Sequence, residues 1–402
     1  FKQKTAYEIR LSLVGSEMCI RDRGYTSILI RRLYVHNFRC LENFELSMEK
    51  RSSVLLIGRN GSGKSTVRMA LELLQGIARG ANRVGDLLGA RDLAWGRTQA
   101  PVRFEIEADI SGVNYVYKIA FELSPEFKEF RVFEESLAAG GQYLFTRTLG
   151  DLSLVPTMAA FRLDWHLAAL PIVQERSDRD PLFIFKRWLA RMIILSPIPD
   201  LIDGGSYTET LEPDSKGVLF GAWFAGLIAH SPADYLAIDR YLREVMPDFV
   251  AVENPISGKD YRKMEILFEG HAGGSFRLPF ETLSMGEKCF LICAVVLAGI
   301  KAYGPVVCFW DEPDSHLALS EVGHFVMKLR SAFKDNGQFI ATSHTEEAIR
   351  KFSEANTFVL DRASHRAPTT VTLLEKLEGR NDVIGALIRG DLTQWSIANS
   401  HM

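Results

Sequence analysis

This chain of 402 residues has no large excess of either charge, no apolar run long enough to cross a membrane and no closely spaced cysteine pair of the C-x-x-C type. Its 47 basic and 50 acidic residues give a net charge of −3, which excludes a generally basic protein that coats nucleic acid but allows a local basic patch. The longest apolar runs, Val218–Ala229 and Cys289–Ile300, have 12 residues each, whereas a membrane-spanning helix needs about 20. We therefore expect two buried helices there, no transmembrane segment and no membrane partner.

The five cysteines are too scattered for a disulfide framework or a zinc site. No two of them form a C-x-x-C pair, and no histidine cluster lies beside them. Cys289 and Cys293 lie four positions apart in an apolar run, so we expect them on one helix face, packed as small hydrophobic side chains. This cysteine usage predicts a reducing compartment, most simply the cytoplasm.

The two ends of the chain differ from the rest. Residues 1–23 have no sustained period and no capping signal, and Glu17 interrupts the only apolar stretch, which excludes a signal peptide. Residues 4–23 also resemble the translated sequencing-adaptor read-through that precedes many unrelated deduced sequences. We interpret residues 1–23 as a non-native leader, with the natural chain beginning near Gly24, and Asn399–Met402 as a vector-derived remnant.

Between these ends, hydrophobic periodicity predicts an α/β pattern. In the first half the expected elements are strands within 27–48, a strand at 54–57, a helix at 64–77, a hairpin at 101–123, and strands at 131–135 and 143–148. The later elements are helices over 180–250, a helix at 286–302, a strand at 306–310, a helix at 318–333, and strands at 338–342 and 357–360. The chain shows no internal repeat and no run of heptads typical of a long coiled coil.

The strongest motif is Gly58–Ser65, which fits the phosphate-binding pattern G-x-x-x-x-G-K-[ST]. A predicted strand precedes it and a predicted helix follows it, as phosphate binding at a helix N-terminus requires. Lys64 would supply a positive charge to the β- and γ-phosphates, and the Ser65 hydroxyl would complete a Mg²⁺ shell. The expected ATP-binding set is Gly58, Asn60, Gly61, Ser62, Gly63, Lys64, Ser65 and Thr66.

Three further motifs gain weight beside the phosphate loop. Val306–Pro313 reads as a buried strand that ends in two carboxylates, where Asp311 would hold Mg²⁺ and Glu312 would act as general base or orient the attacking water. Leu283–Glu287 opens an apolar helix, and its Ser-x-x-Glu spacing is equally typical of a capping box. Ala341–His344 follows a predicted strand, and a histidine at that strand's end can reach a γ-phosphate.

The order of these motifs resembles an ABC-class ATPase. Within that class the chain resembles the AAA-type ATPases related to SMC, RecF and OLD-family proteins rather than transporter cassettes, over about residues 27–360. The resemblance also includes Asn37-Phe-Arg39, Glu134-Glu135, Ser196–Pro199 and residues 236–247. One departure is Asp314–Leu319, where the relatives often continue with E-x-x-L-H-P.

The resemblance implies a role for each matching residue. Glu312, His344 and Lys64 would be catalytic, with His344 sensing the γ-phosphate, and Ser65 and Asp311 would hold Mg²⁺. Four further residues would contact the nucleotide: Asn37 and Arg39 in the same protomer, and Ser284 and Gly286 at the ATP of the opposite protomer. We place no glutamine-loop residue, since Gln99 qualifies by position only.

The implied fold class is α/β: a P-loop ABC-type ATPase head with an N-terminal antiparallel β lobe and a compact helical insert. The expected division is a leader at 1–23, the lobe at 24–150, the insert at 151–260, a C-terminal lobe at 261–365 and a tail at 366–402. The spacing between phosphate loop and signature is far too short for coiled-coil arms, and too few residues follow the last expected strand for a Toprim nuclease domain.

The expected partner is a second copy, in a homodimer that forms around two ATP. One hypothesis is an ATPase that acts on DNA or another nucleic acid in repair or phage defence, and the alternative is a regulatory ATPase that controls a separate effector such as a nuclease or toxin. A transporter cassette is less favoured, because the signature is not LSGGQ. The basic side chains considered for nucleic acid, which could equally form solvated surfaces, are Arg79, Arg83, Arg91, Arg97, Lys186, Arg187 and Arg191, with Trp95 among them.

Overall fold

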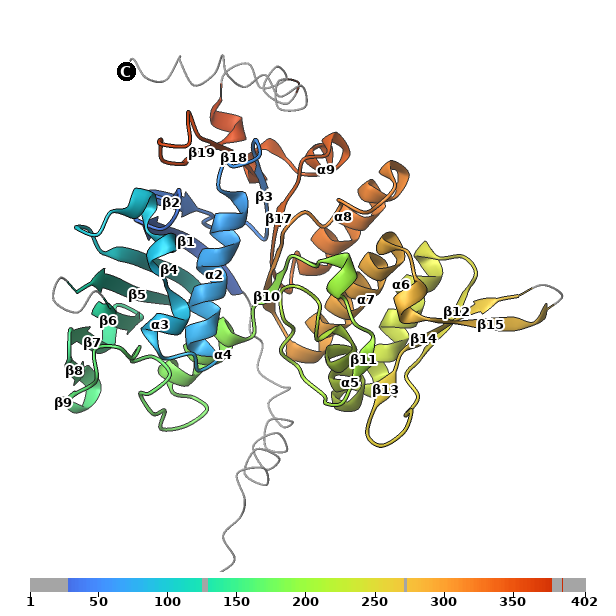
Figure 1. The fold of residues 1–402 in the computed structure, drawn as a ribbon, viewed down its shortest axis with the longest axis horizontal. Coiled ribbons are helices and arrows are strands. Elements are labelled where there is room, and N and C mark those ends of the chain that lie inside the picture. The colour runs from blue at the N-terminus through green and yellow to red at the C-terminus, as the bar shows by residue number, and fades with distance from the viewer. Residues whose placement is uncertain (1–27, 125–128, 271–272, 378–384, 386–402) are drawn as a thin grey trace, which may run out of the picture.

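The computed structural model describes residues 28–124, 129–270, 273–377 and 385. The expected leader and most of the expected tail, including Cys19 and Asn399–Met402, lie outside these residues. Two large sheets organise the described chain: an antiparallel sheet of eight strands and a mainly parallel sheet of six strands, called here the core sheet. Helix α2 (Lys64–Ala78) packs between them (Figure 1), which confirms the expected α/β class.

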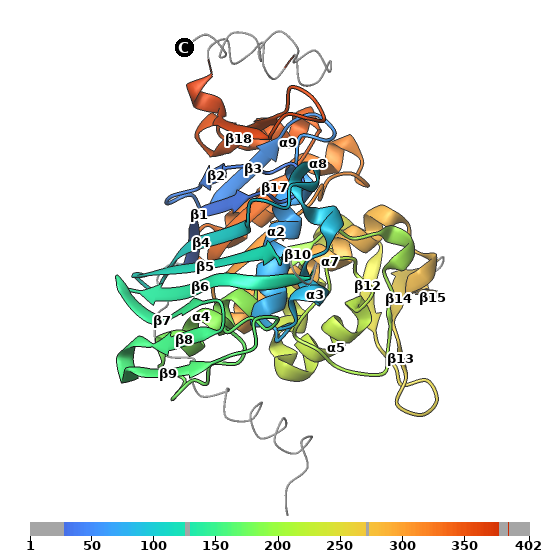
Figure 2. The ribbon, with the colours of Figure 1, turned by 60° about the vertical axis from the view of Figure 1, so that its left-hand side comes forward.

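The antiparallel sheet contains the strands expected within 27–48 and at 101–123, 131–135 and 143–148, and it extends further. Figure 2 shows its strands stacked along one side of the molecule. In chain order they are β1 (Ile28–His36), β2 (Phe44–Ser47), β4 (Val102–Ile110), β5 (Val113–Leu123), β6 (Phe130–Ala139), β7 (Gln142–Thr148), β8 (Asp151–Leu154) and β9 (Ala159–Arg162). Ser111 and Gly112 turn the β4–β5 hairpin with φ of 57° and 79°, because a two-residue turn with positive φ matches the strand twist.

The core sheet has the order β10-β16-β17-β3-β18-β19, and all its pairs are parallel except β18 with β19. Its strands are β3 (Ser53–Ile57), β10 (Ile193–Leu195), β16 (Val306–Trp310), β17 (Gly337–Thr342), β18 (Thr357–Asp361) and β19 (Thr370–Leu373). Every residue of β3, β16 and β17 is buried, since a parallel sheet is covered on both faces. This explains why Val54–Ile57 of β3 and all of β16 appear in the sequence as short apolar runs, whereas β17 also buries the polar Gln338 and Thr342.

Alternate residues of the core sheet point into two separate hydrophobic clusters. Val54 and Leu56 face the cluster that holds α2 and the antiparallel sheet. Leu55 and Ile57 face the cluster that holds α7 (Met285–Tyr303) and α8 (Leu319–Phe333). The buried Gln338 of β17 joins the two sheets, because its side-chain amide accepts from the Ile30 N–H at 2.9 Å and donates to the Ile30 carbonyl at 3.1 Å.

Residues 151–260 are less helical than the sequence predicts. The expected helices are present as α4 (Pro181–Ala190), α5 (Phe220–His230) and α6 (Tyr235–Val245). However, β8 and β9 extend the antiparallel sheet, and β10 forms the edge of the core sheet. These strands have three or four residues each, too few for a period to appear in the sequence. The boundaries of the insert at 151 and 260 stay a prediction.

A small sheet that the sequence analysis did not anticipate lies beside α6. It consists of β12 (Phe249–Glu253), β14 (Glu265–Glu269) and β15 (Ser275–Pro279), and Figure 1 shows it projecting on the side away from the antiparallel sheet. A two-stranded ribbon pairs β11 (Gly205–Ser206) with β13 (Arg262–Lys263).

The two long apolar runs form buried helices, as predicted. Cys289 and Cys293 are buried on α7, and burial raises the pKa of each thiol to about 12. Both thiols therefore stay protonated at neutral pH, which confirms their role in packing. Among the described helices, none combines the length and the apolar character that crossing a membrane demands.

Candidate functional site

The phosphate loop joins β3 to α2, and its glycines are required by geometry. Gly58, Gly61 and Gly63 have φ of 152°, 80° and 105°, backbone conformations that residues other than glycine rarely adopt. A Cβ on Gly58 would meet the Leu360 carbonyl oxygen at 2.2 Å, and a Cβ on Gly63 would meet the Thr369 hydroxyl at 2.8 Å. The loop is thus packed against β18 and the segment before β19, with its backbone free to turn inward.

Lys64 begins α2 and folds back over this loop. Its side chain is nearly buried, with 6% of the residue exposed. The Nζ donates to the carbonyl oxygens of Gly58 at 2.7 Å and Arg59 at 3.2 Å. Burial lowers the pKa of Lys64, while the carboxylates of Glu312 and Asp311 oppose this shift. An ammonium whose hydrogen bonds within the described residues go to neutral carbonyls is well suited to meet an anion.

The two carboxylates lie where β16 ends, as the sequence predicts. The Thr342 hydroxyl, at the end of neighbouring β17, donates to Asp311 Oδ1 at 2.7 Å and accepts from the Glu312 N–H at 2.8 Å. Asp311 Oδ2 pairs with Nε of Arg68 on α2 at 3.3 Å, and its side chain is only 8% exposed. Parallel strands end at the same edge of a sheet, so these groups meet beside the phosphate loop.

Glu312 and His344 form a pair at this edge. Oε1 of Glu312 lies 2.9 Å from Nε2 of His344, and the Ser315 hydroxyl donates to Oε2 at 3.2 Å. The bond from His344 is the largest cause that lowers the pKa of Glu312. Glu312 also has a φ of 51°, a strained value for a residue other than glycine, and such strain is concentrated at functional sites.

Asp314 holds the loop that carries His344, a contact that the sequence analysis did not predict. The carboxylate is buried, and its Oδ2 accepts from the Ser343 hydroxyl at 2.6 Å and from the Thr345 hydroxyl. Residues on both sides of His344 are therefore fixed to the segment that follows Glu312. In the sequence this aspartate appears only as part of the departure from the relatives' pattern.

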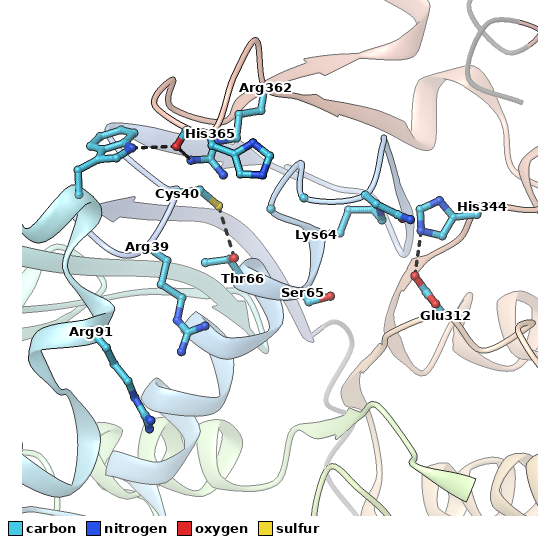
Figure 3. A pocket seen from close by; sticks show the side chains of 14 residues that line it. Arg39, Cys40, Lys64, Ser65, Thr66, Arg91, Glu312, His344, Arg362 and His365 are labelled. Carbon is cyan, nitrogen blue, oxygen red and sulfur yellow. Dashed lines mark hydrogen bonds and ion pairs between the residues drawn. The ribbon is translucent and has the colours of Figure 1, made fainter. Parts of the chain in front are cut away.

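One cavity of about 420 Å³ brings most of the predicted residues together (Figure 3). The predicted residues on its wall are Arg39, Asn60, Gly61, Gly63, Lys64, Ser65, Thr66, Glu312 and His344. Five further lining residues were not predicted to bind the nucleotide: Cys40, Arg91, Trp95, Arg362 and His365. Arg91 and Trp95 were considered only for nucleic acid, and no local pattern marks Arg362 or His365. Their position depends on how β18 and β19 pack.

The comparison with known families agrees with this geometry. A family model described as the RecF/RecN/SMC N terminal domain matches residues 29–365. The chain belongs to this family. The resemblance to SMC- and RecF-related ABC-type ATPases is therefore confirmed, and ATP binding and hydrolysis are properties of such head domains in general. No curated protein matches the chain.

The solved structures that are similar to the chain include three SMC heads, each at low sequence identity. An SMC head bound to the C-terminal winged-helix domain of ScpA has 17% identity over 87% of this chain and 98% of that chain, with a TM-score of 0.49. The SMC head domain of Thermotoga maritima has 14% identity over 86% and 98%, with a TM-score of 0.44. A Pyrococcus furiosus Smc head with an extended coiled coil, bound to the C-terminal domain of ScpA, has 16% identity over 89% and 100%, with a TM-score of 0.49. The family assignment depends on the sequence match.

Some predicted residues are close to this site without lining the cavity. Asn37 is buried, and its side-chain amide donates to the carbonyls of Arg97 at 3.1 Å and Ala100 at 2.7 Å. It therefore organises the loop after α2, while Arg39, on the cavity wall, pairs with Asp92 at 2.8 Å. The buried Ser62 hydroxyl has no hydrogen-bond partner among the described residues. A buried hydroxyl without a partner is unusual in a folded protein, and a ligand bound at the phosphate loop would supply one.

The signature residues form the predicted capping box. The Ser284 hydroxyl accepts from the Glu287 N–H at 3.3 Å, and the Glu287 carboxylate accepts from the Ser284 N–H at 2.7 Å. A Cβ on Gly286 would meet the His316 carbonyl at 3.1 Å, so the signature packs on the segment that follows Glu312. Met285 between them is 44% exposed. Within one chain Ser284 and Gly286 are not among the described residues that line the cavity.

Several of the basic side chains considered for nucleic acid are engaged within the protein. Arg79 donates to the carbonyls of Ala190 at 2.9 Å and Pro213 at 3.1 Å. Arg97 pairs with Glu42, and Lys186 pairs with Glu175. Of the arginines considered for nucleic acid, Arg79 and Arg97 therefore make contacts within the protein, while Arg91 lies on the wall of the cavity.

Proposed function

We propose that the protein binds ATP with Mg²⁺ in this cavity, hydrolyses it, and dimerises around the nucleotide as a molecular switch. One observation carries the proposal: Lys64, Ser65, Glu312 and His344 come from two distant parts of the chain and line a single cavity. Its volume of about 420 Å³ falls in the range of roughly 300–1,000 Å³ for small-molecule sites.

The phosphate end of the cavity fits a triphosphate and its metal ion. Within the described part of the chain, Lys64 donates only to neutral carbonyls and the Ser62 hydroxyl has no partner. Ser65 and Asp311 are the residues that would hold Mg²⁺, a cation that prefers oxygen ligands. When bound, Mg²⁺ would neutralise charge on the β- and γ-phosphates. Asp311 already stabilises a cation, the guanidinium of Arg68.

Glu312 and His344 supply the chemistry at the γ-phosphate. The lowered pKa of Glu312 keeps it ionised at neutral pH, so it accepts a hydrogen bond from the attacking water and orients it. Phosphoryl transfer depends mainly on positioning and charge stabilisation, and a carboxylate of low basicity can perform this role. His344 is held through Asp314 and Glu312, and from there it donates to the γ-phosphate.

The second half of each site comes from a partner copy. Ser284 and Gly286 are absent from the described lining of the cavity, whereas Ser284 and Met285 are exposed. A capped helix N-terminus with an exposed hydroxyl is suited to an anion, and in a symmetric dimer each signature would meet the other protomer's ATP. Contact of Gly286 with the segment after Glu312 links the two halves.

The test mixes two inactive variants. Lys64→Ala loses ATP binding, while Ser284→Arg binds ATP and cannot close the dimer. In a mixed dimer one site carries both changes and the other carries neither. Random pairing makes half of the dimers mixed, and one of the two sites in each mixed dimer is intact. The hydrolysis rate should therefore recover to at most about a quarter of the wild-type rate. A site that is complete within one chain predicts no return of activity.

Cooperativity between the two sites could hide this return, so a control is needed. Glu312→Gln should retain ATP and accumulate a dimer on a sizing column in the presence of Mg²⁺. A monomeric Glu312→Gln together with no recovery on mixing would overturn the dimeric mechanism.

We propose nucleic acid or a separate effector as the target of the switch. The internal contacts of Arg79, Arg97 and Lys186 leave fewer basic side chains for nucleic acid than the sequence suggests. The deciding measurement is the ATPase rate with and without DNA across a salt titration, because phosphate contacts weaken steeply with salt. A rate that DNA does not change at any salt concentration favours the effector.

A further inference from the structure

Trp95 lies on the cavity wall in an unusual backbone conformation. Its φ and ψ are 50° and 26°, the left-handed region that disfavours a residue with a bulky side chain. The indole is partly exposed in a cavity lined otherwise mostly by polar groups. Strained backbone conformations cluster at ligand sites. A contact between the Trp95 ring and a bound ligand would offset the conformational cost at this residue.

Two contacts hold the indole in place. Its Nε1 donates to the backbone carbonyl of His365 at 3.1 Å, across 270 positions of sequence. Arg362 donates to the same carbonyl and, at 2.7 Å, to that of Ala367, which rigidifies the loop between β18 and β19. The guanidinium of Arg97 lies 4.8 Å from the centre of the Trp95 ring, and Arg97 is fixed in turn by Glu42.

Trp95 lies at the end of the cavity away from Glu312 and His344. Figure 3 shows the labelled Arg362 and His365 on the opposite side of the phosphate loop and Lys64 from the Glu312–His344 pair. Trp95 is joined to His365 and therefore belongs to that far end. With the γ-phosphate at Glu312 and His344, the base of the same molecule points toward Trp95.

We propose that Trp95 is the platform on which the nucleobase stacks, and that it gives the site a preference for purine over pyrimidine nucleoside triphosphates. This inference rests on the proposed function. An aromatic ring fixed before binding loses little freedom when a base stacks on it, and purines offer the larger ring system. Trp95 thus determines which nucleotide binds, while the phosphate end acts on any triphosphate.

The test compares ATP with inorganic tripolyphosphate, which carries the same charges without a base. Affinities are measured by titration calorimetry for wild type, Trp95→Ala and Trp95→Phe. Trp95→Ala should weaken ATP binding about tenfold, as expected from loss of a base–aromatic stack, and leave tripolyphosphate binding within about twofold of wild type. Trp95→Phe should retain most of the affinity, and the ratio of ATP to CTP affinity should fall toward one in Trp95→Ala.

Trp165 offers a matched control. It is also partly exposed and also lies under an arginine, with Arg131 at 5.1 Å from its ring, yet it is not among the described residues that line the cavity. Trp165→Ala should bind ATP as wild type does. In a second readout, ATP should quench the tryptophan fluorescence of wild type and Trp165→Phe but not of Trp95→Phe.

The outcomes separate this proposal from the proposed function. If Trp95→Ala weakens ATP and tripolyphosphate equally, or weakens neither, Trp95 is not a base platform, although ATP binding stands. If wild type binds neither compound, both proposals fail. A melting temperature of Trp95→Ala near that of wild type shows that the comparison concerns binding, and Trp95→Phe supplies the comparison if the alanine variant does not fold.

Discussion

The two ends of the cavity are built in different ways. At the phosphate end, Gly58–Lys64 and the strand that leads into Glu312 are continuous segments with recognisable patterns. At the far end, Trp95 comes from a short 3-10 turn and Arg362 and His365 from a loop, none with a recognisable pattern, and both Trp95 and Arg362 donate to the His365 backbone carbonyl. A site built on one continuous segment can be predicted from a sequence motif. A site whose residues come from separate segments cannot, because no local pattern marks them. The two ends should therefore respond differently to mutation.

The largest effect should come from Glu312→Gln at the phosphate end. Without the carboxylate that orients the water, kcat should fall roughly 10²–10⁴-fold, while ATP affinity and the preference for purines stay unchanged. Single-turnover rates and nucleotide titrations measure both quantities. A change in purine preference would show that the two ends are not independent.

Asp314→Ala should have a smaller effect on the same end. Loss of the buried carboxylate leaves the hydroxyls of Ser343 and Thr345 without their acceptor, so stability should fall by roughly 1–3 kcal/mol. Because His344 lies between them, kcat should fall more than ATP affinity. Asp314→Asn is the matched control, since its amide oxygen can still accept, and it should recover most of the stability. Equal losses in both variants would contradict this account.

Arg68→Gln tests the metal position. Arg68 pairs with Asp311 and, at 2.6 Å, with Glu72, so its removal takes away the guanidinium paired with Asp311 and leaves the nearby Lys64 ammonium. Without Mg²⁺, Arg68→Gln should have a lower melting temperature than wild type. Mg²⁺ added with nucleotide should restore that melting temperature, and the variant should bind Mg²⁺ several-fold more tightly than wild type. Glu72→Gln removes the other partner and should leave Mg²⁺ affinity unchanged. Weaker Mg²⁺ binding in Arg68→Gln would mean that Arg68 supports the metal rather than occupying its place.

The smallest expected effect concerns pH. The pKa of Glu312 is lowered in the folded protein, chiefly by the bond from His344. Its ionised form therefore stabilises the fold above the ordinary glutamate pKa, and that contribution is lost as the pH falls through the lower, folded value. The difference in unfolding midpoint between wild type and Glu312→Gln should stay constant near neutral pH and narrow below about pH 4. Partial exposure of Glu312 keeps this difference small. If the midpoint difference between wild type and Glu312→Gln grows as the pH is lowered, ionised Glu312 does not stabilise the fold and this account is wrong.

Elements with a clear period could be predicted from the sequence, and very short ones could not. The helices at 64–77 and 286–302 and the strand at 306–310 were expected where α2, α7 and β16 lie. The three residues of β10 carry no period, and only pairing with β16 makes them a strand. For the same reason, the helices expected between 151 and 260 alternate in the structure with strands that complete two different sheets.

The same division applies to the site. Glycines with positive φ, a lysine at a helix start and carboxylates at a strand end have their positions imposed by neighbouring residues, so the sequence by itself determined the phosphate end and the family. Asp314 bonds to Ser343, 29 positions away, and Trp95 bonds to His365, 270 positions away. Arg362, next to His365 in the same loop, reaches the cavity together with it. Only the tertiary structure decided these contacts, because the order of β16, β17, β3 and β18 in the core sheet determines which loops meet at its edge.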